Sequence, residues 1–412
     1  MTATGTATGA GPRELVIVGA SLAGLRAAEA LRAQGFTGNL TVVGDEPRLP
    51  YDRPPLSKQV LTATDRPAST ELPLPDGLDI RWRLGQAAVA LDPDTRTVTL
   101  ADGARLPYDG LLIATGSAAR GWPAEQPPPR GVMTLRGWDD ALALRAELVP
   151  GRRLVVVGAG FLGGEIAAAA RARGLDVTLV ETGNQPLERA IGAVAGTFVA
   201  TLHREAGIDL RTGTTVTDFH ASADGRLTGV RLSDGTEAGA TAAVLALGAV
   251  PATGWLAGSG IAVDGGVRCD PCLRALRPDG TAVPGVVTAG DIARAPQALA
   301  DGEPLALGHW TNAVEQAATA AHTLLHPDAP RPFTGVPSFW SDLHGVKIRS
   351  VGLPGAADEA RVLEYDLGAR RLEVSYHRAG RLVGALTVGR VSRLAAYRQE
   401  LQQRQLLPTP AA

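Results

Sequence analysis

The strongest constraint on this chain is a small-residue turn that occurs twice, each time between an apolar run and a helical pattern. Residues 15–24 (LVIVGASLAG) form the first copy, and residues 154–163 (LVVVGAGFLG) form the second. In both copies an apolar run of strand length precedes the turn, and Ala-rich residues at helical spacing follow it. Each copy therefore predicts a buried parallel strand that leads into a helix N-terminus.

A helix N-terminus of this kind can hold a phosphate group. Its first N–H groups have no partner within the helix, and the helix dipole places partial positive charge there. The dinucleotide fingerprint is G-x-G-x-x-G. The second copy carries all three glycines, whereas the first keeps Gly19 and Gly24 and has Ser21 at the middle position. Two such folds predict two dinucleotides, with FAD on the first and a nicotinamide nucleotide on the second.

Each predicted βαβ unit has an acid at the end of its second strand. Asp45 follows the predicted strand 40–44, and Glu181 follows the predicted strand 176–180. A carboxylate at this position accepts hydrogen bonds from ribose hydroxyls. The Glu181 carboxylate would also meet the 2′-phosphate of NADPH with like charge, at a cost on the order of a few kcal/mol. The sequence therefore predicts a preference for NADH.

Length and composition limit the other possibilities. The 412 residues are enough for two or three domains. A formal net charge of −2 gives no reason to expect nucleic-acid binding, and no unbroken apolar stretch predicts a membrane-spanning helix. Residues 1–11 lack the features of a signal peptide, and two cysteines form no disulfide framework. We therefore expect a cytoplasmic protein with a disordered start and a loose tail at residues 408–412.

Lysine is rare in this chain. It occurs only as Lys58 and Lys347, and every other Lys or Arg position is arginine. Lys58 closes the segment 50–58 (PYDRPPLSK), whose two adjacent prolines predict a stiff, extended conformation. In one interpretation this segment aims Arg53 and Lys58 at a flavin or its phosphates. In the other it is a rigid surface loop.

The remaining elements follow from periodicity and turn signals. We expect a β-meander over residues 81–100, a Pro-rich linker at 122–129 and a hairpin-rich piece at 213–235. After residue 326, short alternating strands and a terminal helix at 391–404 predict a third, α+β domain. The other expected elements are strands 14–18, 153–157 and 242–247, helices 22–34, 139–148, 161–173 and 310–325, and C-terminal strands at about 346–351, 361–365, 371–377 and 382–388.

Several motifs now stand in a fixed order along the chain. They are residues 51–58 (YDRPPLSK), 114–117 (ATGS), 158–165 (GAGFLGGE), 289–291 (AGD), 310–313 (WTNA) and 339–342 (FWSD). In combination they resemble the FAD-dependent NADH:ferredoxin reductases that supply oxygenases, of the putidaredoxin reductase and dioxygenase ferredoxin reductase type. The resemblance covers nearly all of the chain after residue 13. The departures are Ser21 and a longer, Cys-containing segment at 268–284.

The resemblance implies the α/β architecture of glutathione reductase, with two Rossmann-like dinucleotide-binding domains and a C-terminal α+β domain. It implies an FAD-binding domain split into residues 1–117 and 246–327, with the NAD-binding domain, residues 118–245, inserted in it. The C-terminal domain, residues 328–412, is then expected near the flavin.

The resemblance also implies most residues of the two cofactor sites. The glycine turns themselves add Ser21, Gly24 and Gly163. The FAD site would comprise Gly19, Ser21, Ala23, Gly24, Asp45, Arg53, Lys58, Ala88, Arg120, Asp291 and Trp310. The nicotinamide site would comprise Gly158, Gly160, Leu162, Gly163, Glu165, Glu181 and Gly248. No catalytic side chain and no metal ligand is expected, because the cofactors supply the chemistry. NADH would pass a hydride to FAD, which would then release single electrons to an iron–sulfur ferredoxin and so to a monooxygenase or dioxygenase.

Two other functions are compared with this one. An NADH oxidase, peroxidase or disulfide reductase needs a redox cysteine near the flavin, and the segment 54–58 offers none. We expect Cys269 and Cys272 to be inert, although their spacing is that of a redox pair. An NADH-sensing binding protein of the apoptosis-inducing-factor kind would need basic patches or a targeting segment, which the sequence does not show.

Two smaller groups of residues complete the sequence hypotheses. His322 and His326 are four residues apart on a predicted helix, and we expect a surface pair and not a metal site. Arg331, Lys347 and Arg349 are candidates for steering an acidic ferredoxin toward the flavin edge.

Overall fold

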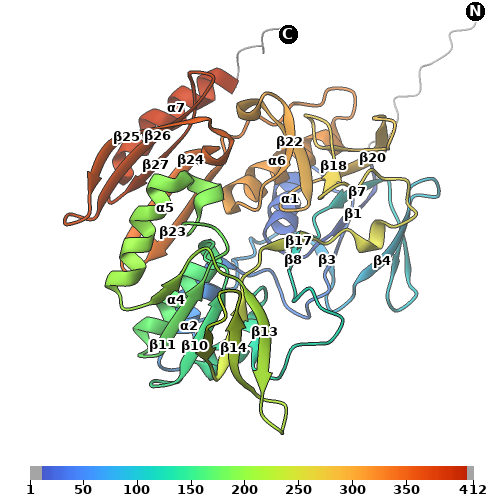
Figure 1. Ribbon diagram of the computed structural model, residues 1–412. Helices are drawn as coiled ribbons and strands as arrows, with labels where there is room; N and C mark the ends of the chain where they lie inside the picture. The colour runs from blue at the N-terminus through green and yellow to red at the C-terminus, as the bar shows by residue number, and fades with distance from the viewer. Residues whose placement is uncertain (1–11, 406–412) are drawn as a thin grey trace, which may run out of the picture.

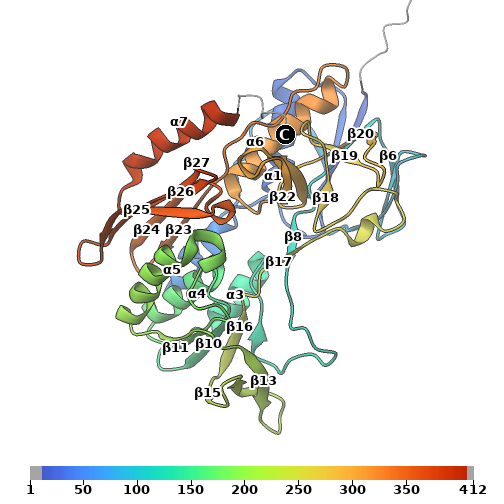
Figure 2. The ribbon, with the colours of Figure 1, turned by 45° about the horizontal axis from the view of Figure 1, so that its top comes forward.

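The computed structural model describes residues 12–405, so the tails expected at residues 1–11 and 408–412 lie outside the described range. The chain forms three units, each built on its own main sheet (Figure 1). The third unit, red in Figures 1 and 2, packs beside the green helices of the second unit. Within residues 12–405, no helix combines the length and apolar character needed to span a membrane.

The first unit is a six-stranded sheet in the order β19-β20-β7-β1-β2-β3, in which the strands from β20 to β3 run parallel. Helices α1 and α6 lie side by side on one face and bury alanine-rich stripes against it (Figure 1). Small side chains let these helices approach the sheet closely. The bounds are β1 (Glu14–Val18), α1 (Leu22–Ala33), β2 (Asn39–Val43), β3 (Ile80–Arg83), β7 (Gly110–Ile113), β19 (Arg274–Leu276), β20 (Ala282–Thr288) and α6 (Trp310–Leu325).

The β-meander expected over residues 81–100 is only partly correct. Its first strand, β3, joins the parallel sheet beside β2. As the edge strand, β3 alternates between half-buried and exposed residues, so its pattern resembles that of a meander strand. The meander on the other face comprises β4 (Ala88–Asp92), β5 (Thr97–Leu100) and β6 (Arg105–Pro107), and a further small sheet comprises β18 (Val267–Arg268), β21 (Ala293–Gln297) and β22 (Glu303–Ala306).

The second unit is a five-stranded parallel sheet in the order β12-β11-β10-β16-β9. Its bounds are β9 (Val132–Met133), α3 (Trp138–Glu147), β10 (Arg153–Val157), α4 (Phe161–Ala172), β11 (Asp176–Val180), α5 (Glu188–Glu205), β12 (Asp209–Arg211) and β16 (Ala242–Leu245). An antiparallel sheet of β13 (Val216–Ala221), β14 (Leu227–Leu232) and β15 (Glu237–Gly239) covers it. Helix α5 is not predicted from the sequence. Gly192 kinks this helix with a φ of +77°, which interrupts the helical pattern.

The chain enters and leaves the second unit through two neighbouring strands. β8 (Ser117–Ala119) and β17 (Ala249–Pro251) pair antiparallel between the first and second units (Figure 1). The first sheet is therefore built from chain segments on both sides of the second sheet in sequence.

The third unit is an antiparallel sheet in the order β23-β24-β27-β26-β25, with α7 packed on it. Four of its five strands are predicted from the sequence, and the fifth, β23, is not. The predicted terminal helix is preceded by a short 3₁₀ turn at residues 391–393. The bounds are β23 (Ser338–Leu343), β24 (Val346–Gly352), β25 (Glu359–Asp366), β26 (Arg371–Arg378), β27 (Arg381–Val388) and α7 (Leu394–Gln405).

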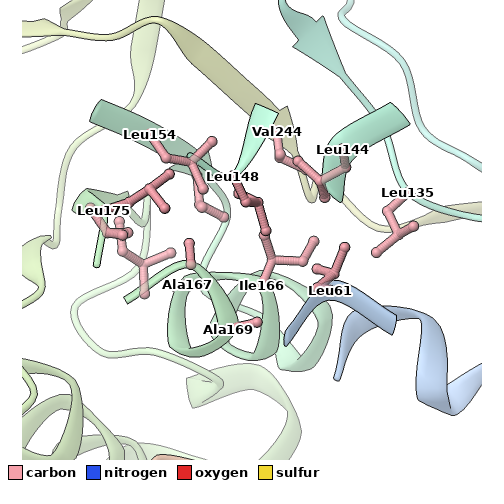
Figure 3. Close-up of a cluster of buried hydrophobic side chains, with 14 of the residues drawn as sticks. Leu61, Leu135, Leu144, Leu148, Leu154, Ile166, Ala167, Ala169, Leu175 and Val244 are labelled. Carbon is pink, nitrogen blue, oxygen red and sulfur yellow. The ribbon is translucent and has the colours of Figure 1, made fainter. Parts of the chain in front are cut away.

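The segment with two prolines belongs to the first unit in sequence but packs into the core of the second. It forms a 3₁₀ turn, η1 (Pro54–Ser57), followed by α2 (Gln59–Thr62). The expectation of an extended segment is therefore wrong, since the fixed φ of proline also suits the first turn of a helix. Leu61, on the blue helix in Figure 3, lies among side chains of α3 and α4 such as Leu144 and Ile166.

A pair of histidines joins the second and third units. His203 on α5 is buried, and its Nδ1 lies 2.9 Å from Nε2 of His344, in the turn between β23 and β24. Burial lowers the pKa of His203 to about 3 and that of His344 to about 4. Both rings are therefore neutral in the folded protein at pH 7.

These two histidines should make the protein less stable in mild acid. In the unfolded chain the two rings bind protons below a pH of about 6.5, whereas in the folded chain the same rings stay neutral down to about pH 4. The free energy of unfolding should therefore fall by up to about 1.4 kcal/mol per pH unit and per histidine across that window. Urea unfolding at a series of pH values measures this slope.

The control for this prediction removes the titrating rings. The double variant His203→Gln/His344→Gln should have a flatter pH dependence than the wild type. An unchanged slope in the double variant would contradict the assignment.

Candidate functional site

The first glycine turn is shaped by contacts with its own sheet. Gly19 has a φ of +126°, and a Cβ there would overlap the carbonyl oxygen of Ala114, the residue just after β7. A Cβ on Gly24 would overlap the carbonyl oxygen of Gly19. Both glycines are therefore required by packing. Ser21 is the N-cap residue of α1 and makes no capping hydrogen bond with its side chain, so it leaves the first N–H groups of the helix open to a ligand.

The second turn repeats this geometry. Gly158 has a φ of +103°, and its Cβ would overlap the carbonyl oxygen of Ala246. A Cβ on Gly163 would likewise overlap the carbonyl oxygen of Gly158. Gly160 differs, because a Cβ there would meet no atom within 4 Å. Open space at the start of α4 is what a pyrophosphate requires, so the turn fits a dinucleotide.

The acids after the second strands lie beside these turns. Glu181 accepts hydrogen bonds from the backbone N–H of Ala159 and of Gly183, both at 2.8 Å. Its carboxylate therefore braces the second glycine turn from the side. Asp45 is exposed, and its Oδ1 accepts a hydrogen bond from the Glu46 backbone at 2.9 Å. The backbone N–H of Gln86 donates to the carbonyl of Gly44 at 2.8 Å. This hydrogen bond places the start of β4, and hence Ala88, close to Asp45.

Arg53 is held by protein groups from both the first and the second unit. It forms an ion pair with Glu46 at 2.5 Å and donates to the carbonyl of Arg136 at 2.8 Å. Tyr51 donates to the same Glu46 carboxylate at 2.6 Å, and burial raises the pKa of this tyrosine. The two prolines after Arg53 fix its position in this network.

Asp291 lies where the first and second units meet. Its Oδ2 accepts hydrogen bonds from the Ser117 hydroxyl at 3.0 Å and from Arg136 at 2.9 Å. Gly290, its neighbour, packs against Ala23 in the first turn of α1. Asp291 therefore lies near the same helix start as the first glycine turn.

The start of α6 carries His309 and Trp310. Trp310 donates from Nε1 to Asp52 at 2.8 Å, and its ring centroid lies 6.0 Å from that of Trp340. His309 has a buried Nδ1 with no hydrogen-bond partner, and burial lowers its pKa to about 4. A cavity of about 720 Å³ is lined by His309, Phe161 and Phe339, among others. It reaches the start of α4, which follows the second glycine turn.

Lys58 and Glu165 connect the first unit to the second. Lys58 Nζ lies 2.7 Å from Oε2 of Glu165, which is only 7% exposed. Ser57 donates to the same oxygen at 2.5 Å, and Ser341 donates to Oε1 at 2.6 Å. A second cavity, of about 630 Å³, reaches this pair between α2, α4 and the β23–β24 turn. Lys58 is therefore not on a free surface loop.

Two of the remaining predicted residues lie at the junction of the units, and a third lies in the second unit. The backbone N–H of Arg120 donates to the carbonyl of Gly248 at 3.0 Å, so these two residues are neighbours although the sequence analysis assigned them to different cofactors. Leu162 packs, partly buried, against the core of the second unit.

The structure also places the two cysteines, and the pair of histidines at the end of α6, His322 and His326. Cys269 is buried in the core of the first unit, both thiols are free, and burial raises the pKa of each. The rings of His322 and His326 lie 4.5 Å apart. Across residues 12–405, no three His, Cys, Asp or Glu side chains gather as metal ligands.

Sequence reasoning did not single out four residues that the structure places in these networks. They are Ser57, Arg136, His309 and Ser341. Ser57 and Ser341 lie within quoted motifs, but only their contact with Glu165 reveals a role. Those contacts span 108 and 176 residues of sequence, which no local pattern encodes.

Comparison with protein families covers nearly the whole described chain. The family described as pyridine nucleotide-disulphide oxidoreductase matches residues 13–317, and the one described as reductase C-terminal matches residues 338–412. Rhodocoxin reductase of Rhodococcus erythropolis is 38% identical over 84% of this chain and 79% of its own length. Putidaredoxin reductase of Pseudomonas putida is 34% identical over 91% of this chain and 88% of its own length.

Solved structures agree with these matches. The covalent putidaredoxin reductase–putidaredoxin complex contains a chain with a TM-score of 0.88 and 32% identity, over 96% of this chain and 94% of that one. A water-forming NADH oxidase from Lactobacillus brevis has a TM-score of 0.81 at 23% identity, which shows the shared fold alone. The ferredoxin reductase component of the chlorobenzene dioxygenase of Cupriavidus sp. is 36% identical over 82% of this chain and 80% of its own length. The chain therefore belongs to the pyridine nucleotide-disulphide oxidoreductases, among the ferredoxin reductases of oxygenase systems.

Proposed function

We propose that this protein is an FAD-containing reductase that carries electrons from NADH to an iron–sulfur ferredoxin, which supplies a monooxygenase or dioxygenase. The observation that carries the proposal is the Lys58–Glu165 pair at 2.7 Å, which joins the units of the two glycine turns. A dinucleotide on each turn would have its reactive ring directed toward this junction. The protein would then supply binding and orientation, and the cofactors would supply the chemistry.

The proposed FAD site lies on the first unit. FAD, when bound, converts a two-electron hydride into single electrons. The N–H groups at the start of α1 would hold its pyrophosphate, and Asp45 would accept from its ribose. Asp291, held by Ser117 and Arg136, would bind a second polar part of the cofactor. Lys58 would hold a positive charge beside the ring, with Glu165 fixing the ammonium.

The proposed nicotinamide site lies on the second unit. The start of α4 would hold the pyrophosphate over Gly160, where the structure leaves open space. The cavity lined by Phe161, His309 and Phe339 leads from this turn toward the start of α6. Neutral His309, whose Nδ1 has no partner, would offer a hydrogen bond there.

The remaining proposals concern the units and the setting. We assign FAD binding to residues 1–117 and 246–327, NAD binding to 118–245 and the reductase C-terminal domain to 328–412. The described parts of these ranges coincide with separate main sheets, which supports the division. We also propose a cytoplasmic location, supported by two free thiols. A redox-cysteine mechanism is not supported, because Cys269 lies in the hydrophobic core.

The proposed activity predicts that electron transfer to cytochrome c depends on a ferredoxin. The flavin-loaded protein should reduce cytochrome c rapidly with NADH only when a ferredoxin is added. Steady-state rates with NADH, measured without ferredoxin and with each member of a panel of ferredoxins, test this. Equal rates with and without ferredoxin, or oxygen consumption that accounts for all NADH, would favour an oxidase instead.

The same assay tests the surface that meets the ferredoxin. Arg331 and Lys347 are exposed, whereas Arg349 is held by Asp342 at 3.2 Å. If these cations steer an acidic ferredoxin, the initial rate at low ferredoxin concentration should fall as ionic strength rises. A rate independent of salt would contradict electrostatic steering.

Glu181 should determine the choice between NADH and NADPH. Glu181→Arg removes a carboxylate that would repel a 2′-phosphate, so the kcat/KM ratio should shift toward NADPH by about tenfold or more. Glu181→Gln is the matched control, because it loses the charge but keeps an acceptor for Ala159 N. It should relax the preference without reversing it. Equal specificity for both cofactors in the wild type would refute the assignment.

The two glycines at the start of α4 should respond differently to a methyl group. Gly160→Ala places a Cβ in open space, so the fold should survive while NADH affinity falls by about tenfold or more. Gly163→Ala forces a Cβ onto the Gly158 carbonyl, so the free energy of unfolding itself should fall by several kcal/mol. Urea unfolding and NADH titration separate the two effects. Unchanged NADH affinity in Gly160→Ala would place the pyrophosphate elsewhere.

A further inference from the structure

All three units of the chain meet at one buried carboxylate. Glu165 lies on α4 of the second unit, and its Oε2 receives Lys58 and Ser57 from the first unit, at 2.7 and 2.5 Å. Its Oε1 accepts a hydrogen bond from the hydroxyl of Ser341, on β23 of the third unit, at 2.6 Å. The two oxygens are thus held by different units.

Ser341 is a polar residue within an apolar contact. On β23, Phe339 packs against Phe161 of α4 with ring centroids 4.7 Å apart, and Leu343 lies beside Gly164. Ser341 stands between these two residues on the same face of the strand and is fully buried. Packing alone gives no reason for a hydroxyl here. The Oε1 atom of a buried carboxylate does, because an unpaired charged oxygen is costly in such surroundings.

We propose that Ser341 is a positioning residue for the hydride-accepting site, acting through Glu165 on Lys58. Its hydrogen bond fixes the rotation of the carboxylate, and this rotation keeps Oε2 directed at the Lys58 ammonium. Without it, the carboxylate is free to turn toward other donors and the ammonium loses a fixed partner. This inference rests on the proposed function, in which the ammonium lies beside the flavin ring.

The proposal distinguishes Ser341 from a residue that only stabilises the fold. A merely structural serine would affect the free energy of unfolding and little else. A positioning serine would also change a property of the flavin itself, because a well-placed positive charge favours the electron-rich form and raises the midpoint potential. The flavin midpoint potential is therefore the decisive readout, and it does not depend on turnover.

The experiment compares variants of the flavin-loaded protein. Ser341→Ala removes the donor, Ser341→Cys keeps the size with a weak donor, and Ser341→Thr keeps the hydroxyl. Ser350→Ala is the matched control: Ser350 is buried in the adjacent strand, and its hydroxyl donates to the Ala385 carbonyl at 3.0 Å, away from Glu165. For each variant, the midpoint potential is measured against redox dyes, the flavin reduction rate at saturating NADH by stopped flow, and the melting temperature by calorimetry.

Ser341→Ala and Ser341→Cys should lower the midpoint potential and slow flavin reduction by about tenfold, the effect of losing one hydrogen bond to a charged group. Ser341→Thr should stay within about twofold of the wild type. Ser350→Ala should lower the melting temperature but leave the potential and the rate unchanged. If Ser341→Ala does not fold, the cysteine and threonine variants carry the comparison.

A double variant tests whether Ser341 acts through Glu165. Ser341→Ala/Glu165→Gln should reduce the flavin no more slowly than Glu165→Gln alone, because the serine has no other route to Lys58. The inference would be overturned if the double variant reduced the flavin more slowly than Glu165→Gln, by the product of the two single losses. It would also be overturned if Ser341→Ala left the midpoint potential and the rate unchanged. Either result would leave the proposed function intact. A wild-type protein that binds no FAD, or whose flavin NADH does not reduce, would overturn both.

Discussion

The arrangement of this molecule depends on one buried ion pair between Lys58 and Glu165. A carboxylate that is 7% exposed loses most of its hydration, and this loss must be offset by several well-placed donors. The ammonium of Lys58 and the hydroxyls of Ser57 and Ser341 supply them. Because the donors come from two units other than that of Glu165, the charge is stable only when all three units are correctly docked.

Apolar packing brings the ammonium to this carboxylate. The paired prolines form the first half of the 3₁₀ turn, α2 follows it, and Leu61 of α2 inserts between α3 and α4 (Figure 3). Arg173 and Arg145 then bind the carbonyl of Ala63 just beyond α2, at 3.1 Å each. Lys58 therefore has a place in the second unit that its own neighbours in sequence could not provide.

The sequence predicts those parts of the fold that local chemistry determines. The glycine turns, strands β10 and β11, and helix α6 appear at the predicted positions because each has a complete local pattern. Helix α5 was not predicted because Gly192 interrupts its helical periodicity. The prediction of an extended segment at Pro54 and Pro55 was wrong because the fixed φ of proline suits both an extended chain and the first turn of a helix. Lys58 was noticed through the rarity of lysine and Glu165 through the resemblance, but neither their pairing nor the role of Ser341 could be predicted, since those contacts are tertiary.

The two glycine turns show how similar local sequences can have different demands. In both turns the outer glycines are required by backbone packing against the sheet, independently of any ligand. The middle position has no such packing requirement at Gly160, where a side chain would enter open space. The ligand alone therefore restricts the middle residue, and a serine at the equivalent position of the first turn is compatible with the fold. What distinguishes a binding turn from a merely tight one is thus the space left at this position, together with a charged pair placed between the two turns.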